Sequence, residues 1–312
     1  MIKVITLGTG CALPTPERNL SATAVVREGD LLLFDCGEAA QIQIRRAGLK
    51  LSRLRHVFIS HLHGDHITGL VGLLMTMAMT DRREPLEIYG PPELAEYLDS
   101  CRRLLGLRFT YPVRCRPAHP GVLCEAQNYT VSCRSLRHRI PTFGYAFREK
   151  DRPGRFLIEK AKELNVPEGP LFGRLQRGEE VVLSDGRAVS PSQVLGPSRR
   201  GVKIAYCLDT APCPEAQQLA HEADLLIHDS TFAPEDAQRA AEQDHSTSLQ
   251  AALLARDAGV RHLILTHISS RYTDEQTLLA PAREIFPNTL IAHDLMEIEV
   301  GSNAECGIKN PS

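Results

Sequence analysis

Four side chains that can bind a metal ion fall within six consecutive residues, in the segment HLHGDH at residues 61–66. Imidazole and carboxylate donors without a thiolate suit Zn²⁺ and also accept Mn²⁺ or iron. An apolar, strand-like run precedes the segment, so we expect a loop at a strand end, in which the glycine lets the backbone bend. His61 and His63 would then face one ion, whereas Asp65 and His66 would face a second.

Three more donors stand at the ends of apolar, strand-like runs far along the chain. His138 follows NYTVSCRSLR, Asp209 follows KIAYCL, and His267 follows HLILT. Because the strands of a sheet end at a common rim, we expect these side chains to gather there. A carboxylate can bridge two ions, which gives one assignment for seven donors: His61, His63 and His138 on one metal, Asp65, His66 and His267 on the other, and Asp209 shared. Two ions about 3.5–4 Å apart would hold a hydroxide between them and clamp a phosphate oxygen.

The elements that must position these donors alternate between strands and helices, which indicates an α/β protein. We expect strands at residues 2–8, 56–60, 203–208, 224–228 and 261–266, and a hairpin of residues 22–28 and 31–36. We expect helices at residues 38–48, 66–79, 212–222, 234–242 and 249–258. Most methionines of the second helix should lie in its core-facing stripe.

Composition excludes several classes of protein. With 312 residues, 43% hydrophobic and 24% charged, the chain is neither disordered nor collagen-like nor a coiled coil. No apolar run reaches the ~18–20 residues of a membrane span, and the first residues do not resemble a signal peptide. The nine cysteines form no C-x-x-C pair, so we expect reduced thiols in a cytoplasmic protein without membrane contact.

One stretch differs from the rest in charge. Residues 148–203 hold twelve Lys and Arg against eight Asp and Glu, which gives this stretch a net charge of +4. Because the whole chain has a net charge of −2, the remainder of the chain has a net charge of −6. By itself, such a high content of charged residues is typical of a solvated, loop-rich insertion. Residues 301–312 show no periodicity, and we expect a tail without regular structure.

The HLHGDH segment with its distant His, Asp and His resembles the metallo-β-lactamase superfamily. Further motifs narrow the resemblance to the ribonuclease Z family, which matures tRNA 3′ ends. They are GTG at residues 8–10 with LP at 13–14 and ERN at 17–19, FDCGE at 34–38 with Gln41, DT at 209–210, HST at 245–247 and LTHISSRY at 265–272. The resemblance implies an αββα sandwich, two mixed sheets flanked by helices, with a protruding arm. It divides the chain into a single domain at residues 1–300, a flexible tRNA-binding arm inserted at 149–200, and a tail at 301–312.

The resemblance also implies a reaction. A metal-bridging hydroxide would attack a phosphodiester and remove the 3′ trailer from precursor tRNA, leaving a 3′-hydroxyl, with two Zn²⁺ per chain or another divalent ion such as Mn²⁺. Asp65 would accept a proton from the attacking group. His245, which belongs to neither ligand set, would protonate the leaving oxygen or stabilise the transition state, and Asp229 would orient it. Because members of this family are commonly homodimers, the resemblance also implies a homodimer.

The same resemblance supplies candidates for substrate binding. Arg18, Asn19, Thr210 and Arg271 would line the cleft near the scissile phosphate. The arm would grip the tRNA elbow through the turn that contains Gly169 and Pro170. Its apolar residues would build a small hub: Phe156, Leu157, Ile158, Leu171 and Phe172.

Two departures from the family pattern stand out. Leu208 replaces the glycine that usually precedes the bridging aspartate, and could crowd the backbone there. Asp229 replaces a glutamate, so any hydrogen bond it makes must shift by one methylene. Two alternatives stay open: another hydrolase on the same scaffold, such as a small-molecule phosphodiesterase, and a non-catalytic RNA-binding relative.

Overall fold

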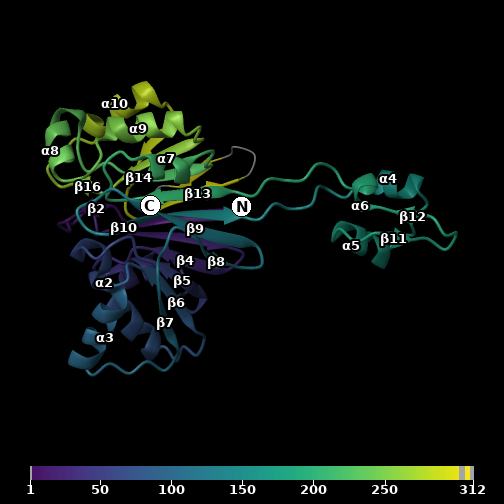
Figure 1. Ribbon diagram of the computed structural model, residues 1–312, viewed down its shortest axis with the longest axis horizontal. Coiled ribbons are helices and arrows are strands. Elements are labelled where there is room, and N and C mark those ends of the chain that lie inside the picture. The colour runs from purple at the N-terminus through teal and green to yellow at the C-terminus, as the bar shows by residue number, and fades with distance from the viewer. Residues whose placement is uncertain (1, 302–305, 310–312) are drawn as a thin grey trace. The chain divides into compact units, whose positions relative to one another are not determined.

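The computed structural model describes residues 2–301 and 306–309, and two β-sheets packed face to face form its larger unit (Figure 1). The first sheet has eight strands in the spatial order β19 (Cys306–Lys309), β18 (Met296–Val300), β1 (Ile2–Gly8), β3 (Ala22–Arg27), β4 (Asp30–Phe34), β5 (Leu54–Phe58), β6 (Leu86–Gly90) and β7 (Val113–Pro117). The second has seven: β17 (Thr289–Ile291), β15 (His262–Thr266), β14 (Leu225–Asp229), β13 (Lys203–Cys207), β10 (Thr142–Glu149), β9 (Tyr129–Leu136) and β8 (Gly121–Glu125). Both sheets mix parallel and antiparallel pairs.

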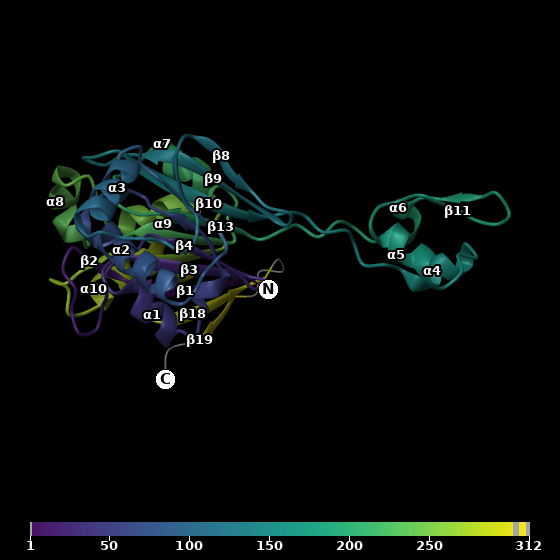
Figure 2. The same cartoon turned by 90° about the horizontal axis from the view of Figure 1, so that it is seen from below.

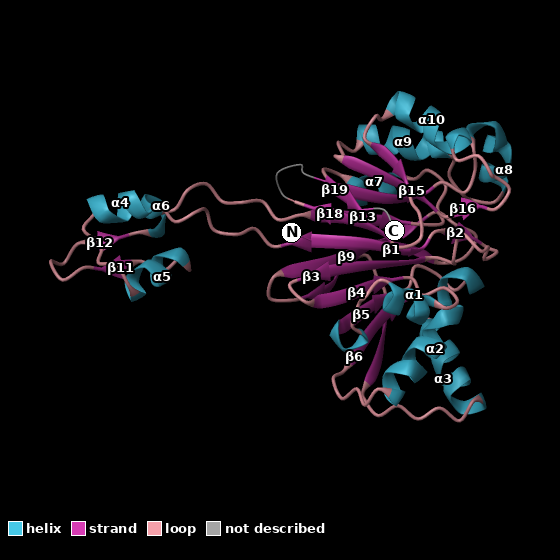
Figure 3. Cartoon of the chain, turned by 180° about the vertical axis from the view of Figure 1, so that it is seen from behind, coloured by secondary structure: helices cyan, strands magenta, loops and turns pink. Residues whose placement is uncertain are grey.

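Helices cover the outer face of each sheet (Figures 2 and 3). The first sheet packs against α1 (Ala40–Arg46), α2 (Gly64–Met79) and α3 (Leu94–Leu104), and the second against α7 (Pro214–Ala220), α9 (Ser248–Asp257) and α10 (Gln276–Ile285). Shorter elements are η1 (Leu51–Arg53), η2 (Pro234–Asp236), α8 (Ala237–Glu242) and a parallel pair, β2 (Gly10–Cys11) with β16 (Ile268–Ser269). This arrangement confirms the αββα sandwich expected from the sequence.

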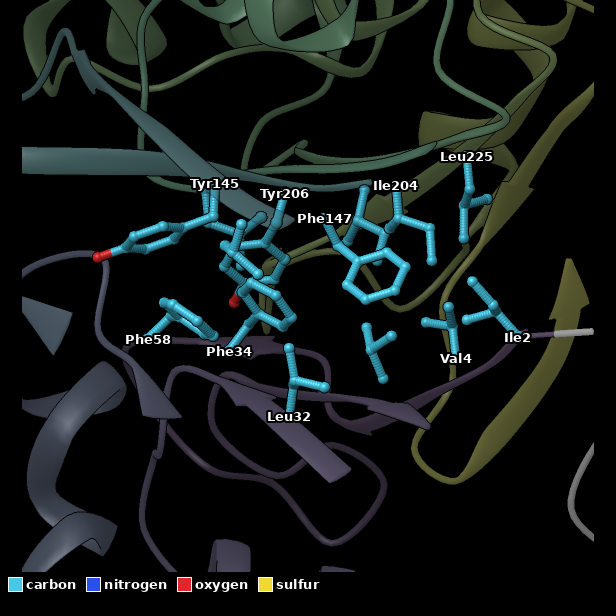
Figure 4. Packing of buried hydrophobic residues seen from close by; sticks show 14 of the residues in the cluster. Ile2, Val4, Leu32, Phe34, Phe58, Tyr145, Phe147, Ile204, Tyr206 and Leu225 are labelled. Atoms are coloured by element: carbon cyan, nitrogen blue, oxygen red, sulfur yellow. The ribbon is translucent and has the colours of Figure 1, made fainter. Parts of the chain in front are cut away.

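The core between the sheets is rich in aromatic side chains (Figure 4). Phe34 of β4 and Phe58 of β5 stack with ring centroids 5.1 Å apart, and the rings of Tyr145 and Tyr206 lie against them from the second sheet. The Tyr145 hydroxyl donates to the carbonyl of Ile59 at 2.6 Å, which satisfies a polar atom that would otherwise be costly to bury.

The expected strands and helices are confirmed to within a few residues, and three details differ. Helix α2 begins at Gly64, so HLHGDH is a loop only up to His63, and its glycine takes a helical conformation. Among the methionines of α2, only Met77 is buried, whereas Met75 and Met79 are exposed. Four residues of the expected tail form β19, because main-chain pairing with β18 requires no side-chain periodicity; residues 302–305 and 310–312 lie outside the described part.

Residues Glu149–Gly201 form a second compact unit. It contains α4 (Ile158–Glu163), α5 (Pro170–Gln176), α6 (Pro191–Val194) and the hairpin of β11 (Val181–Val182) with β12 (Ala188–Val189). Its own core holds Ala161, Val166, Leu175, Val181, Leu183, Val189 and Val194. Of the expected hub, Phe156 and Phe172 pack with ring centroids 4.7 Å apart, but Ile158 is exposed on α4. We call this unit the arm.

Candidate metal centre

Each of the seven candidate donors lies at or just beyond the end of a strand. His61 and His63 follow β5, with His63 in extended backbone directly before α2, and Asp65 and His66 occupy the first turn of α2. The remote donors follow three strands of the second sheet: His138 after β9, Asp209 after β13 and His267 directly after β15. The rim of the sandwich therefore brings all seven together.

The first group of donor atoms surrounds one point. His63 Nδ1 lies 2.9 Å from His61 Nε2 and 3.4 Å from His138 Nε2, and Asp209 Oδ2 lies 3.4 Å from His61 Nε2. Ligand atoms about 2.0–2.1 Å from a tetrahedral zinc ion lie about 3.3 Å from one another. The first group thus has the spacing of a tetrahedral site.

The second group has the same spacing. His267 Nε2 lies 3.3 Å from His66 Nε2, from Asp65 Oδ2 and from Asp209 Oδ1. Since Oδ2 of Asp209 faces the first group and Oδ1 the second, this carboxylate has the geometry of a bridging ligand.

The burial and the charge of Asp209 fit a divalent cation at this site. Asp209 is 2% exposed, and its Oδ1 has no hydrogen-bond partner in the described structure, which is costly unless a cation occupies the site. Burial opposes ionisation of Asp209, but His267, His66 and His61 outweigh it and hold its pKa well below its usual range. Burial lowers the pKa of His61 and of His138, which favours the neutral imidazole that metals require. At His66 and His267 the Asp209 carboxylate outweighs burial and raises the pKa, so a cation would have to displace a proton from these two imidazoles.

Four imidazoles are oriented by hydrogen bonds from Nδ1, which leave Nε2 toward the centre. The acceptors are Ser60 Oγ for His61 (2.9 Å), Asp35 Oδ2 for His66 (2.8 Å), the Asp244 carbonyl for His138 (3.0 Å) and Thr231 Oγ1 for His267 (2.8 Å). His63 differs, because its Nδ1 faces the other donors.

Asp35 is a functional residue that sequence reasoning did not single out. Its buried carboxylate accepts from the Ser60 amide and hydroxyl, from His66 Nδ1 and from the Tyr206 hydroxyl, all at 2.7–2.9 Å. The available signal was its place in FDCGE, directly after the apolar run of β4. Asp35, Asp209 and His267 all have φ between 50° and 60°, a left-handed conformation that is uncommon for these residues and typical of functional sites.

The turn after β4 approaches α2 so closely that two glycines are required. The Cys36 amide donates to the His66 carbonyl, and the Gly69 amide to the Cys36 carbonyl. A Cβ on Gly69 would lie 1.9 Å from the Gly37 carbonyl oxygen, and one on Gly37 would lie 2.6 Å from that of Asp65. This contact fixes the first turn of α2, which carries two candidate ligands.

His245 lies beside the centre and is held by Asp229. Its Nδ1 lies 2.9 Å from Asp229 Oδ2, and its ring stacks on His267 at 5.5 Å between centroids. Burial would lower the pKa of His245, but the Asp229 carboxylate outweighs this and raises it. Asp229 also accepts hydrogen bonds from the Thr231 hydroxyl and from the amides of Thr210 and Ser246. Although its side chain is one methylene shorter than the glutamate of the family pattern, both carboxylate oxygens therefore have hydrogen-bond partners.

The candidate substrate-binding residues differ in how far their polar groups are already bonded to the protein. The Arg18 guanidinium bonds to Thr9, to the Ala292 carbonyl and to Glu275, so its contacts here are with the protein. Asn19 Nδ2 donates to the Glu38 carbonyl, and the Thr210 hydroxyl donates to the Ala211 carbonyl. Arg271 is exposed, with its guanidinium over the Phe232 ring. Gly169 and Pro170 begin α5 in the arm.

A pocket and a cysteine involve segments that adjoin the candidate residues in sequence or in space. A pocket of about 380 Å³ is lined by Gly10, Leu13, Thr15, Glu17, Arg18, Ile268, Ser269, Ser270, Tyr272, Thr273 and Glu275. The Cys11 sulfur lies within 4.8 Å of ligand atoms of Asp65 and His267, a proximity that the sequence gave no reason to expect. Leu208, whose effect was in question, packs into the core between the sheets.

A sandwich of two mixed sheets with a His- and Asp-lined rim defines a protein of the metallo-β-lactamase fold. The crystal structure of the metallo-β-lactamase fold protein YhfI from Bacillus subtilis superposes with a TM-score of 0.67 at 20% identity, covering 95% of this chain and 98% of that one. A family model for the anti-Pycsar protein Apyc1 matches residues 2–107.

Closer relatives specify the family. Ribonuclease Z of Nostoc punctiforme is 47% identical over 97% of this chain and 98% of its own length, and ribonuclease Z of Acaryochloris marina is 45% identical over 96% and 98%. The crystal structure of human tRNase Z, short form, matches with a TM-score of 0.70 at 29% identity, over 96% of this chain and 99% of that one. The chain belongs to the ribonuclease Z family, which confirms the resemblance seen in its motifs.

Proposed function

We propose that this protein is a metal-dependent endoribonuclease that removes the 3′ trailer from precursor tRNA and leaves a 3′-hydroxyl. The observation that carries the proposal is the two-sided Asp209 carboxylate between two sets of donors, in a chain nearly half identical to proteins named ribonuclease Z. We assign His61, His63, His138 and Asp209 to one ion, and Asp65, His66, His267 and Asp209 to the other. The donor set suits two Zn²⁺ and would also accept Mn²⁺.

The chain's own residues then act on the reacting atoms. A pair of divalent ions held by these residues would neutralise the phosphodiester charge and lower the pKa of a water molecule at the site. The Asp65 carboxylate accepts the water proton, and the Ala12 amide, which donates to its Oδ2 at 2.8 Å, fixes the orientation of this side chain. Burial would raise the pKa of Asp65, but His267 and His66 outweigh burial and lower it. The carboxylate is therefore ionised, as this role requires.

His245 protonates the leaving oxygen. The Asp229 carboxylate favours the imidazolium form, which can donate a proton, and fixes which ring nitrogen faces the substrate. This pair gives the 3′-oxygen of the mature tRNA, a poor leaving group, its proton as the bond breaks.

The arm and the loops beside the centre would bind the tRNA. We assign tRNA elbow binding to the arm through the turn at Gly169 and Pro170. Contacts with the scissile end are assigned to Asn19, Thr210 and Arg271, and Arg18 holds the loop beside them.

We also propose a homodimer, which would cover the exposed Ile42 of α1 and Met79 of the adjacent α2. Met79→Glu should then yield monomers in analytical ultracentrifugation, and a monomeric wild type would contradict the dimer.

The decisive experiment is incubation with a precursor tRNA, with and without a chelator, for the wild type and Asp65→Ala. We expect cleavage at the mature 3′ end by the wild type only, abolished by the chelator and restored by Zn²⁺ or Mn²⁺. Persistent cleavage by Asp65→Ala would reject that proton acceptor. Hydrolysis of small phosphodiesters without cleavage of precursor tRNA would instead favour the small-molecule phosphodiesterase.

A further inference from the structure

Two arginines bracket the candidate ligand His138 and have no role in the scheme above. Arg137 and Arg139 follow β9, and the main chain of Arg137 bonds to the loop after Asp209, since the Ala211 amide donates to the Arg137 carbonyl at 2.9 Å. Their guanidinium groups therefore start from backbone that is anchored at the metal centre itself.

Both side chains reach the turn that carries His245. Arg139 Nη2 donates to the Glu242 carbonyl at 2.6 Å, and Arg137 Nε lies 3.6 Å from Asp244 Oδ1. His138 Nδ1, between them, donates to the Asp244 carbonyl. Three consecutive residues thus hold the turn whose next residue is His245.

Both guanidinium groups remain accessible to an anion. The Arg137 side chain is 69% exposed, and its ion pair with Asp244 is long and exposed, which makes it worth little. Arg139 is exposed, and a carbonyl oxygen takes only one of its five N–H donors. A phosphate, which accepts two parallel N–H bonds from one guanidinium, would compete well with either partner.

The net charge of the chain outside the arm makes local cations at the metal centre important for RNA binding. The part of the chain outside residues 148–203 has a net charge of −6, so its attraction for RNA cannot come from overall charge and must come from local cations. Arginines on the rim of the centre supply such cations where the scissile end of the RNA must lie.

We propose that Arg137 and Arg139 bind backbone phosphates of the mature tRNA end, on the leaving-group side of the scissile bond. The inference rests on the proposed function, in which His245 protonates the 3′-oxygen that stays with the mature tRNA. Because the two arginines hold the turn next to His245, they face the strand that departs with that oxygen, and the trailer lies on the other side.

The test uses Arg137→Ala, Arg139→Ala and the double variant. Arg134→Ala on β9, the strand that precedes both arginines, is the matched control, since Arg134 is also exposed. We expect KM for precursor tRNA to rise about three- to tenfold per arginine, and the dependence of log KM on log salt concentration to flatten by about 0.7–0.9. The inhibition constant of mature tRNA should rise by the same factor, while that of a free trailer oligonucleotide should not change. Arg→Lys variants should recover part of the affinity.

Two results would overturn the proposal. A fall in kcat with KM and salt slope unchanged, accompanied by an equal loss of small-phosphodiester hydrolysis, would show that the arginines only position the His245 turn. Weaker binding of the trailer rather than of mature tRNA would place them on the opposite side. A wild type that binds mature tRNA but fails to cleave precursor tRNA would refute the proposed function, and binding of mature tRNA by the variants would still decide this inference.

Discussion

The Tyr206 hydroxyl donates a hydrogen bond to Asp35 Oδ2 across the interface of the two sheets, at 2.9 Å. The same oxygen accepts from His66 Nδ1 at 2.8 Å. One buried carboxylate therefore joins the packing of the sandwich to the orientation of a candidate ligand.

This relationship predicts that Asp35→Asn weakens metal binding chiefly at the site of His66. The loss of an oriented ligand should lower the affinity about 10–100-fold, as measured by chelator competition. Tyr206→Phe is the matched control, because it removes one donor and keeps the carboxylate, and should cost about 1–2 kcal/mol of stability with a smaller effect on affinity. Equal metal affinity of Asp35→Asn and the wild type would contradict this role.

Asp209→Asn should reduce the metal content more than any other single amide substitution. The carboxylate faces both donor groups, so both ions lose a charged ligand. We expect about two ions per chain in the wild type and fewer than one in the variant, measured by elemental analysis after dialysis. A wild type that is active with one ion per chain would contradict the two-ion assignment.

Asp229→Asn should shift the pH profile of precursor cleavage. In the proposed mechanism His245 acts in its protonated form, and Asp229 raises its pKa, so activity should extend to higher pH than an ordinary histidine would allow. Removing the charge lowers that pKa, and the basic limb of kcat/KM should move to lower pH. Ser246→Ala, which alters the same loop without a change of charge, should leave the limb in place. An unmoved limb in Asp229→Asn would reject His245 as the acid.

Gly69→Ala should destabilise the fold strongly, because its Cβ would lie 1.9 Å from a carbonyl oxygen. We expect a loss on the order of 3 kcal/mol or more in urea unfolding. Gly72→Ala on the same helix is the control: its Cβ meets only the end of the Gln41 side chain at 3.0 Å, and alanine favours the helix by up to about 1 kcal/mol. Similar unfolding midpoints for the two variants would contradict the close approach.

Replacing residues 150–201 with a short Gly-Ser turn should separate substrate recognition from chemistry. Arg148 pairs with Lys203 in adjacent strands, so the ends can be closed without strain. We expect kcat/KM for precursor tRNA to fall at least tenfold relative to that for a small phosphodiester, because the phosphate contacts that we assign to the arm would be lost. A shorter deletion, of residues 152–187, would leave Val189 and Val194 without their core. Equal loss of both activities would count against a role in tRNA binding.

The sequence predicted the strands that deliver the donors because these are buried on both faces and read as continuous apolar runs, as in β13 and β15. It also predicted which seven donors would meet. It could not predict the anchors Asp35 and Thr231, since their roles depend on tertiary contacts with His66 and His267. Nor did periodicity indicate β19, whose main chain pairs with β18.

The arm has a separate core and takes the place of a β-hairpin turn between β10 and β13. Evolution can therefore lengthen, shorten or exchange it without altering the register of any strand in the sandwich. With the role in tRNA binding proposed for the arm, substrate choice and bond cleavage would be separable modules, and an arm grafted from a relative would redirect this catalyst to a different RNA.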